Sequence, residues 1–193
     1  TEGRLPGHSY SLHEKIARCA KSAFKSLYFA NVPIAVYAHT TMGSYGETPY
    51  VVGIASNRMP LGPDNIVRST PDFDERFCKS MEVDTRNNYD GFAIEWCANR
   101  FPSTPGSNVL LVWSDGQPNG GSNYSGNAAI EHTKRVIHEV RRKHIAVLSM
   151  SLVQDVVETN DDIYGREYNL RAYGDNMGPA LQSVLQKILL QGH

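Results

Sequence analysis

Apolar positions along the chain alternate between helical spacing and short continuous runs. Apolar residues three or four positions apart predict helices over residues 12–30, 91–100, 127–142 and 179–190. Short apolar runs predict buried strands over residues 32–38, 50–55, 109–113 and 144–152, and a weaker run predicts a fifth strand over 168–173. Because strands alternate with helices, the pattern predicts an α/β fold, with a doubly wound, mostly parallel sheet covered by helices on both faces.

Two stretches interrupt this alternation. The thirty residues after the second predicted strand carry Pro60, Pro63 and Pro71, which predicts a long irregular connection. Residues 116–126 are rich in Gly, Asn and Ser, which predicts a flexible loop directly after the strand that ends at Trp113. Loops of this kind often carry function.

Composition narrows the classes of protein that fit. With 193 residues and 40% hydrophobic content, residues 1–193 can form a single domain with its own core. The formal net charge of -1 provides no basic surface for a nucleic-acid partner, and the sequence has no apolar run long enough for a membrane span. Cys19, Cys78 and Cys97 lie far apart and are odd in number, so a complete set of disulfides is excluded and a cytoplasmic setting is predicted.

Three polar segments are predicted to lie at one edge of the sheet, two of them directly after strands and one directly before the helix from Gly91. They are His39-Thr40-Thr41, Asn88-Tyr89-Asp90-Gly91 and Ser114-Asp115-Gly116. The carboxyl ends of parallel strands share one edge, where ligands bind in open α/β sheets, so these segments are expected to lie together. Their oxygen-bearing side chains suit a hard cation such as Mg²⁺. The alternatives are a turn at Asp115-Gly116, helix capping by Asn88 and Asp90, and ordinary strand-end hydroxyls at Thr40 and Thr41.

Other polar residues are assigned structural roles. His132 and His138 are six positions apart, which does not suit a metal shared on one helix face, and both are predicted to face solvent. Arg141 belongs to a basic group near the end of the predicted helix 127–142, where cations favour the helix dipole. The alternative for that group is a surface for an acidic partner.

Four segments carry a resemblance to a known family. They are KIARCAKSAFKSLYFANVPIAVYAHTT, NYDGFAIEW, VLLVWSDGQPNGG and VIHEVRRKHIAVLSMSL, and they lie within residues 12–152. In this order they resemble the von Willebrand factor A (vWA) domain of the cobaltochelatase T subunit. That resemblance implies a metal-ion-dependent adhesion site for Mg²⁺, or for another divalent cation such as Mn²⁺ or Ca²⁺. The implied metal residues are Asp115, Asn88, Asp90 and Ser114, with His39, Thr40, Thr41 and Gly116 as further contacts at the same edge.

One motif of that family is missing from this sequence. Such domains begin with a central strand that ends in Asp-x-Ser-x-Ser, whereas Thr1 to Gly7 resembles only the tail of the loop that follows. A sheet without its central strand would leave buried backbone groups unpaired, each costing about 1 to 3 kcal/mol. We therefore expect an upstream segment or a second chain to supply the strand and the motif. The alternative is a degenerate domain that binds no metal.

Two functions follow from these expectations. The first is a binding module, in which the cation coordinates an acidic side chain of a protein ligand. The resemblance implies that this module is an adaptor for an AAA+ ATPase of the MoxR type, and a non-ATPase subunit of a cobaltochelatase-like complex in cobalamin biosynthesis. The second is a metal-dependent hydrolase that uses the same edge, with His39 as the general base. No nucleophile elbow and no phosphate-binding loop occurs in the sequence, so the chain is not expected to be catalytic alone.

Overall fold

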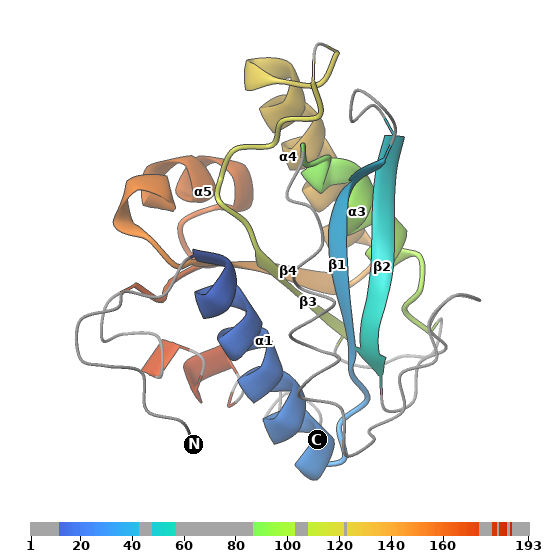
Figure 1. The fold of residues 1–193 in the computed structure, drawn as a ribbon, viewed down its shortest axis with the longest axis vertical. Helices are drawn as coiled ribbons and strands as arrows, with labels where there is room; N and C mark the ends of the chain where they lie inside the picture. The colour runs from blue at the N-terminus through green and yellow to red at the C-terminus, as the bar shows by residue number, and fades with distance from the viewer. Residues whose placement is uncertain are drawn as a thin grey trace.

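The structure is a computed structural model that describes residues 12–42, 48–56, 87–102, 108–121, 123–173, 179–180, 182–184 and 186. Helices and strands alternate through most of these residues, as the apolar pattern predicts (Figure 1). In chain order the elements are α1 (Leu12–Phe29), β1 (Ala35–Met42), β2 (Thr48–Ser56), α3 (Asp90–Ala98), β3 (Asn108–Trp113), α4 (Gly126–Arg142), β4 (Ile145–Ser151), the 3-10 helix η1 (Gln154–Val156), α5 (Val157–Tyr164) and β5 (Asn169–Arg171).

The five strands form two sheets. β3, β4 and β5 pair in that order and in parallel, which confirms the mixed α/β fold with a parallel sheet. β1 and β2 pair in antiparallel fashion, which the prediction of a mostly parallel sheet did not include. The physical reason is the length of their connection. Residues 43–47 join the two strands, whereas a parallel crossover needs a dozen residues or more.

β1 lies further along the chain than the apolar run predicts. The predicted strand covered residues 32–38, whereas β1 runs from Ala35 to Met42. Proline at position 33 has no backbone N–H to donate, so it stands before the ladder rather than within it. The polar residues after Ala38 continue the strand because their backbones pair with β2, as His39 does with Val51.

The core lies between the parallel sheet and the helices. α4 buries one face against this sheet, and Val147 and Met150 of β4 are fully buried. Removing side chains of this size from water stabilises the folded state by about 1.5 to 3 kcal/mol each. Trp113, at the end of β3, packs both against the core cluster of α1, β1 and β2 and against the cluster around Met150. The end of β3 is therefore anchored from two sides.

The segment between β4 and β5 was not predicted as a helix. It contains η1 and α5, and α5 turns buried asparagine Asn160 toward the sheet. The amide of Asn160 donates to the Ser151 hydroxyl at 3.0 Å, and the hydroxyls of Ser149 and Ser151 both donate to Asn169 Oδ1 at 2.9 Å. α5 is short and buries Asn160 together with Ile163 and Tyr164, so the sequence shows no extended apolar helical spacing there.

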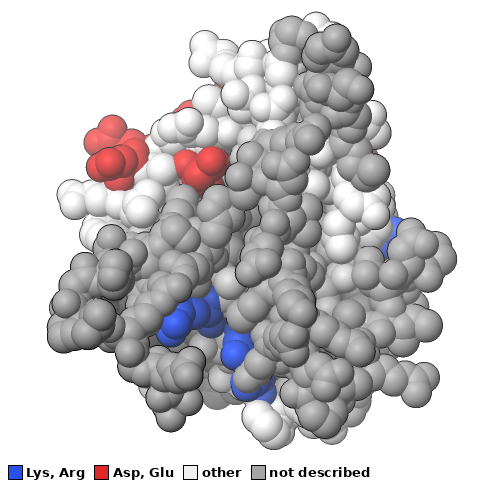
Figure 2. All heavy atoms as spheres, viewed as in Figure 1, with Lys and Arg blue, Asp and Glu red and all other residues white. Residues whose placement is uncertain are grey.

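Several predictions concern residues outside the described part of the chain. These are the proline-containing connection, Cys78 and the segment Thr1–Gly7. The predicted final helix is described only in part, with helical residues at 179–180, 182–184 and 186. Within the described residues, none of the helices combines the length and the apolar character that crossing a membrane requires. In the view of Figure 2, acidic side chains of the described residues gather over α5, and basic ones lie over α1.

Candidate metal centre

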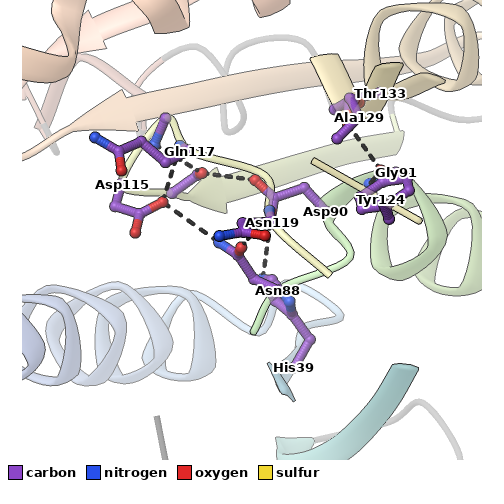
Figure 3. Close-up of polar contacts among 12 residues, drawn as sticks. His39, Asn88, Asp90, Gly91, Asp115, Gln117, Asn119, Tyr124, Ala129 and Thr133 are labelled. Atoms are coloured by element: carbon purple, nitrogen blue, oxygen red, sulfur yellow. Dashed lines mark hydrogen bonds and ion pairs between the residues drawn. The ribbon is translucent and has the colours of Figure 1, made fainter. Parts of the chain in front are cut away.

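Two of the predicted polar segments meet at the carboxyl end of β3. Ser114 and Asp115 directly follow β3, and Asn88 and Asp90 lie just before and at the start of α3 (Figure 3). The Ser114 hydroxyl donates to Asp90 Oδ2 at 2.7 Å, and the Asn88 amide nitrogen lies 3.4 Å from Asp115 Oδ1. We call these four residues the rim. The structure thus brings together the four residues that the sequence singled out as metal residues.

The Ser-Asp-Gly segment is held in one conformation. The backbone N–H of Gln117 donates to Asp115 Oδ1 at 3.0 Å, and that of Gly116 donates to the Ser114 hydroxyl at 3.1 Å. Gly116 has a φ of 73°, in the left-handed region that glycine adopts without steric cost. It also packs on α5, where a Cβ would lie 3.2 Å from Asn160 Oδ1. Asp115 therefore combines a turn, as the alternative proposed, with an exposed carboxylate at the rim.

Asn88 is fixed by the loop that follows Asp115. The backbones of Asn88 and Asn119 exchange two hydrogen bonds, of 2.7 and 2.9 Å, and the Asn119 N–H also donates to Asn88 Oδ1 at 2.8 Å. The amide oxygen of Asn88 is thus committed, and its nitrogen faces Asp115. Asn88 would have to rotate its amide before it could offer oxygen to a cation. The loop predicted to be flexible is therefore paired to Asn88 over part of its length.

Asp90 is buried rather than placed as a helix cap. The N-cap of α3 is Tyr89, no side chain caps the helix, and Asp90 is 1% exposed. The helix-capping alternative for Asn88 and Asp90 is therefore wrong. Asp90 Oδ1 has no hydrogen-bond partner among the described residues, and the nearest cation candidate is His39 Nε2 at 3.8 Å. A buried carboxylate oxygen without a donor is the strongest sign at the rim of a missing ligand.

Three residues of β1 were predicted at this edge, and they differ in how they relate to the rim. His39 reaches Asp90, and its other ring nitrogen, Nδ1, is buried without a partner among the described residues. Thr41 is buried, and its hydroxyl likewise lacks a partner within the described part of the chain. Thr40 is partly buried and makes further contacts. Of the three β1 residues predicted at this edge, His39 contacts the rim, through Asp90.

The rim supplies part of the ligand set of a hard cation. Asp115 and Asp90 offer carboxylate oxygens and Ser114 a hydroxyl, which are donors that Mg²⁺ accepts. Both hydrogen bonds to the Asp115 carboxylate go to Oδ1. Within the described residues no group of three or more His, Cys, Asp or Glu side chains could hold a metal ion. The residues present therefore fit one side of a cation site, whose other ligands would be water and a further segment.

A second cluster of hydrogen-bonded side chains, around Tyr124, was not predicted from the sequence. The Tyr124 hydroxyl accepts the Gly91 N–H at 3.3 Å and contacts His132 Nδ1 at 3.0 Å and the Thr133 hydroxyl at 3.2 Å. His132 is partly buried, so the prediction that it faces solvent is wrong, whereas His138 is exposed as predicted. Burial lowers the pKa of His132, with Arg135 acting in the same direction. Spacing alone gave no signal for this cluster.

Replacing Asp90 with asparagine is expected to remove a pH-dependent loss of stability. Burial raises the pKa of Asp90 above its ordinary value of 3.8, although the charge of His39 and the hydrogen bond from Ser114 oppose this. The folded state thus holds the proton of the Asp90 carboxyl more tightly than the unfolded state does. The contribution of Asp90 to the free energy of unfolding is therefore largest below pH 3.8 and is lost as pH rises through the raised pKa.

The measurement is urea unfolding of both proteins in EDTA at a series of pH values. We expect the free energy of unfolding of Asp90→Asn to exceed that of the unsubstituted protein by a margin that grows as pH rises above 3.8, the ordinary pKa of an aspartate. Asp155→Asn, which changes an exposed carboxylate, is the control. A difference that stays constant with pH for Asp90→Asn would contradict the assignment.

Comparisons with known proteins identify the family and the fold of this chain. The family model described as "Cobalamin biosynthesis protein CobT VWA domain" matches residues 13–191. No curated protein matches the chain. Among solved structures, the pilus adhesin SpaC from Lactobacillus rhamnosus GG is similar with a TM-score of 0.59 at 9% identity, over 92% of this chain. The chain spans 27% of the length of that adhesin, and at this identity the likeness shows the fold alone.

The family match confirms the resemblance and the fold class predicted from the sequence. It extends beyond the segments that carried the resemblance, through α5 and β5 to the last helical residues. Because the match covers nearly the whole chain, the protein belongs to the family of VWA domains of the cobalamin biosynthesis protein CobT.

Proposed function

We propose that this VWA domain binds a partner protein through a divalent cation at the rim. The cation is Mg²⁺, or Mn²⁺ or Ca²⁺, and Asp115 is its main ligand from this chain. The observation that carries the proposal is that two carboxylates lie at the rim: Asp115 is exposed, and Asp90 is buried with an Oδ1 that has no partner among the described residues. Ser114 holds Asp90 in place, and Asn88 contributes an amide oxygen once its side chain rotates.

The remaining protein ligands come, in this proposal, from a strand that carries Asp-x-Ser-x-Ser. The position of β1 and β3 supports this, because each is an end strand of its own sheet. The two sheets nevertheless share core contacts through Trp113. A strand between them would deliver its last residues beside Asp90 and Asp115. An upstream segment or a second chain could supply it.

The partner coordinates the cation with an acidic side chain. Membership of the CobT family links the domain to cobalamin biosynthesis, and we propose that the partner is an AAA+ ATPase of the MoxR type in a cobaltochelatase-like complex. The sequence has no phosphate-binding loop of its own, so ATP hydrolysis would belong to the partner. The domain would then act as an adaptor, in the cytoplasm, between the ATPase and its target.

Loss of Asp115 is expected to weaken cation binding about ten-fold or more, because the exposed carboxylate is the only charged rim group that reaches solvent. Titration calorimetry of Mg²⁺ into the full-length protein and into Asp115→Ala tests this. Asp155→Ala, which removes another exposed carboxylate, is the matched control. Capture of the co-encoded ATPase should need Mg²⁺ and fail for Asp115→Ala. Equal Mg²⁺ affinity in all three proteins, or capture in EDTA, would overturn the proposal.

A metal-dependent hydrolase is the second candidate. The observation that favours it is the approach of His39 Nε2 to Asp90 Oδ1 at 3.8 Å, since a carboxylate beside an imidazole is a common arrangement for a general base. Turnover of a phosphate ester or amide by the isolated protein with Mg²⁺, abolished by His39→Ala, would favour the hydrolase. Absence of turnover together with metal-dependent capture favours the adaptor.

A further inference from the structure

His39 and Asp90 approach each other across a gap that no hydrogen bond spans. His39 Nε2 lies 3.8 Å from Asp90 Oδ1, whereas an N–H···O hydrogen bond is about 2.7 to 3.2 Å long. Asp90 Oδ2 accepts the hydrogen bond of the Ser114 hydroxyl, but Oδ1 has no hydrogen-bond partner among the described residues. A carboxylate oxygen and a ring nitrogen therefore lie near each other without a direct bond.

The separation of these two atoms fits two ligands of one metal ion. Nitrogen and oxygen ligands of small divalent metal ions lie about 2.0 to 2.2 Å from the ion. Two such ligands, at an angle between a right angle and a trigonal one, are about 2.8 to 3.8 Å apart. His39 Nε2 and Asp90 Oδ1 fall at the upper end of that range, so a shared ion requires little movement of either side chain.

The pairing and packing of β1 hold His39 at this position. Its backbone pairs with that of Val51 in β2. The ring of Tyr37, two positions earlier on the same face of β1, contacts that of Trp96 in α3 at 5.2 Å, centroid to centroid. This face of β1 is thus turned to α3, whose first residue is Asp90. The His39 side chain is 26% exposed and that of Asp90 1%, so the pair is open to solvent on the histidine side.

The other ring nitrogen of His39 is compatible with metal binding through Nε2. A histidine that binds a metal ion through one nitrogen usually donates the N–H of the other to an oxygen. His39 Nδ1 is buried and has no partner within the described part of the chain, and the buried hydroxyl of Thr41 has none there either. Thr41 lies two positions further along the same face of β1, so it offers an oxygen on the side chain nearest in sequence on that face.

We propose that His39 Nε2 is a nitrogen ligand of the cation at the rim, and that it makes the site select a first-row transition metal ion such as Mn²⁺ over Mg²⁺ and Ca²⁺. Mg²⁺ and Ca²⁺ take oxygen ligands, whereas transition metal ions also accept imidazole. The inference rests on the proposed function, because it concerns the same cation. No group of three or more His, Cys, Asp or Glu side chains in the described ranges could hold a metal ion, so water and the supplied strand complete the ligand set. With Nε2 on the cation, His39 is not the general base of the hydrolase candidate.

The test is electron spin echo envelope modulation of Mn²⁺ bound to the full-length protein. A directly bound imidazole gives nitrogen modulation, and ¹⁵N-labelled histidine should change its pattern, which assigns the signal to a histidine. His39→Gln places an amide group within the reach of Nε2 and should remove the histidine modulation. His138→Gln changes an exposed histidine on α4, and this matched control should retain the modulation. The measurement on the unsubstituted protein needs no variant, and circular dichroism checks that both variants are folded.

Calorimetric titrations with Mn²⁺ and with Mg²⁺ measure the selectivity of the same proteins. We expect His39→Gln to lose about ten-fold of the preference for Mn²⁺ over Mg²⁺, which is the order of effect when a group that tunes a metal site is removed. An unchanged preference in His39→Gln, or no histidine modulation in the unsubstituted protein, would overturn the inference. If Mg²⁺ binding still depends on Asp115 in that case, the proposed function stands without it. Absence of binding of either ion would overturn both.

Discussion

Replacing Gly120 with alanine is expected to destabilise the folded protein by about 3 kcal/mol through overpacking. A Cβ at this position would lie 2.2 to 2.5 Å from three carbon atoms of the Tyr89 ring. That ring has no room to move away, because it stacks on Tyr124 and its hydroxyl donates to the Gly120 carbonyl. The backbone at Gly120 must therefore shift, and the adjoining Asn119, which holds Asn88, must shift with it.

Urea unfolding measures the loss of stability, and Mg²⁺ titration should show weaker binding in the same variant. Gly126→Ala is the matched control. Gly126 has a φ of 55° but no atom within 4 Å of an added Cβ, so its substitution carries backbone strain of about 1 to 2 kcal/mol and no clash. A Gly120→Ala variant that is no less stable than Gly126→Ala would contradict this prediction, because it would show that the Tyr89 ring can move away from the added Cβ.

The parts of the fold that the sequence predicted well are those with one dominant local signal. α4 has regular apolar spacing, and β3 and β4 are continuous apolar runs, so their bounds agree with the prediction to within one or two residues. The position of Ser114 and Asp115 at the end of β3 followed from that strand alone. Asn88 and Asp90 lie just before and at the start of a helix instead, and the family resemblance was what grouped them with Ser114 and Asp115 as metal residues.

The parts that it missed depend on contacts between distant segments. Asp90 stands at a helix start, where an aspartate is usually an exposed cap, yet it is buried because Ser114 and His39 enclose it. The amide orientation of Asn88 is set by Asn119, thirty-one positions away. The environment of His132 is set by Tyr124 and Phe92. Periodicity reports which face of an element is apolar, and it carries no information on such partners.

Arg141 illustrates the same limit, because sequence position gave it the role of a charge at a helix terminus. In the structure it is partly buried, and its Nη2 donates to the carbonyls of Val147 at 2.8 Å and Tyr164 at 2.7 Å. Its guanidinium also lies over the ring of Tyr168. The side chain therefore joins α4 to β4, to the end of α5 and to the segment before β5.

Arg141→Met is accordingly expected to lower the free energy of unfolding by about 3 to 5 kcal/mol, since two charge-assisted hydrogen bonds are lost and two buried carbonyls lose a donor. Arg142→Met is the matched control, because Arg142 lies in the same last helical turn but is exposed. That variant removes the same charge from the helix terminus and should cost about 1 kcal/mol or less. Urea unfolding of both variants decides between the roles. Similar losses would support the helix-dipole role, whereas a loss confined to Arg141→Met shows that this arginine acts through the carbonyls it binds.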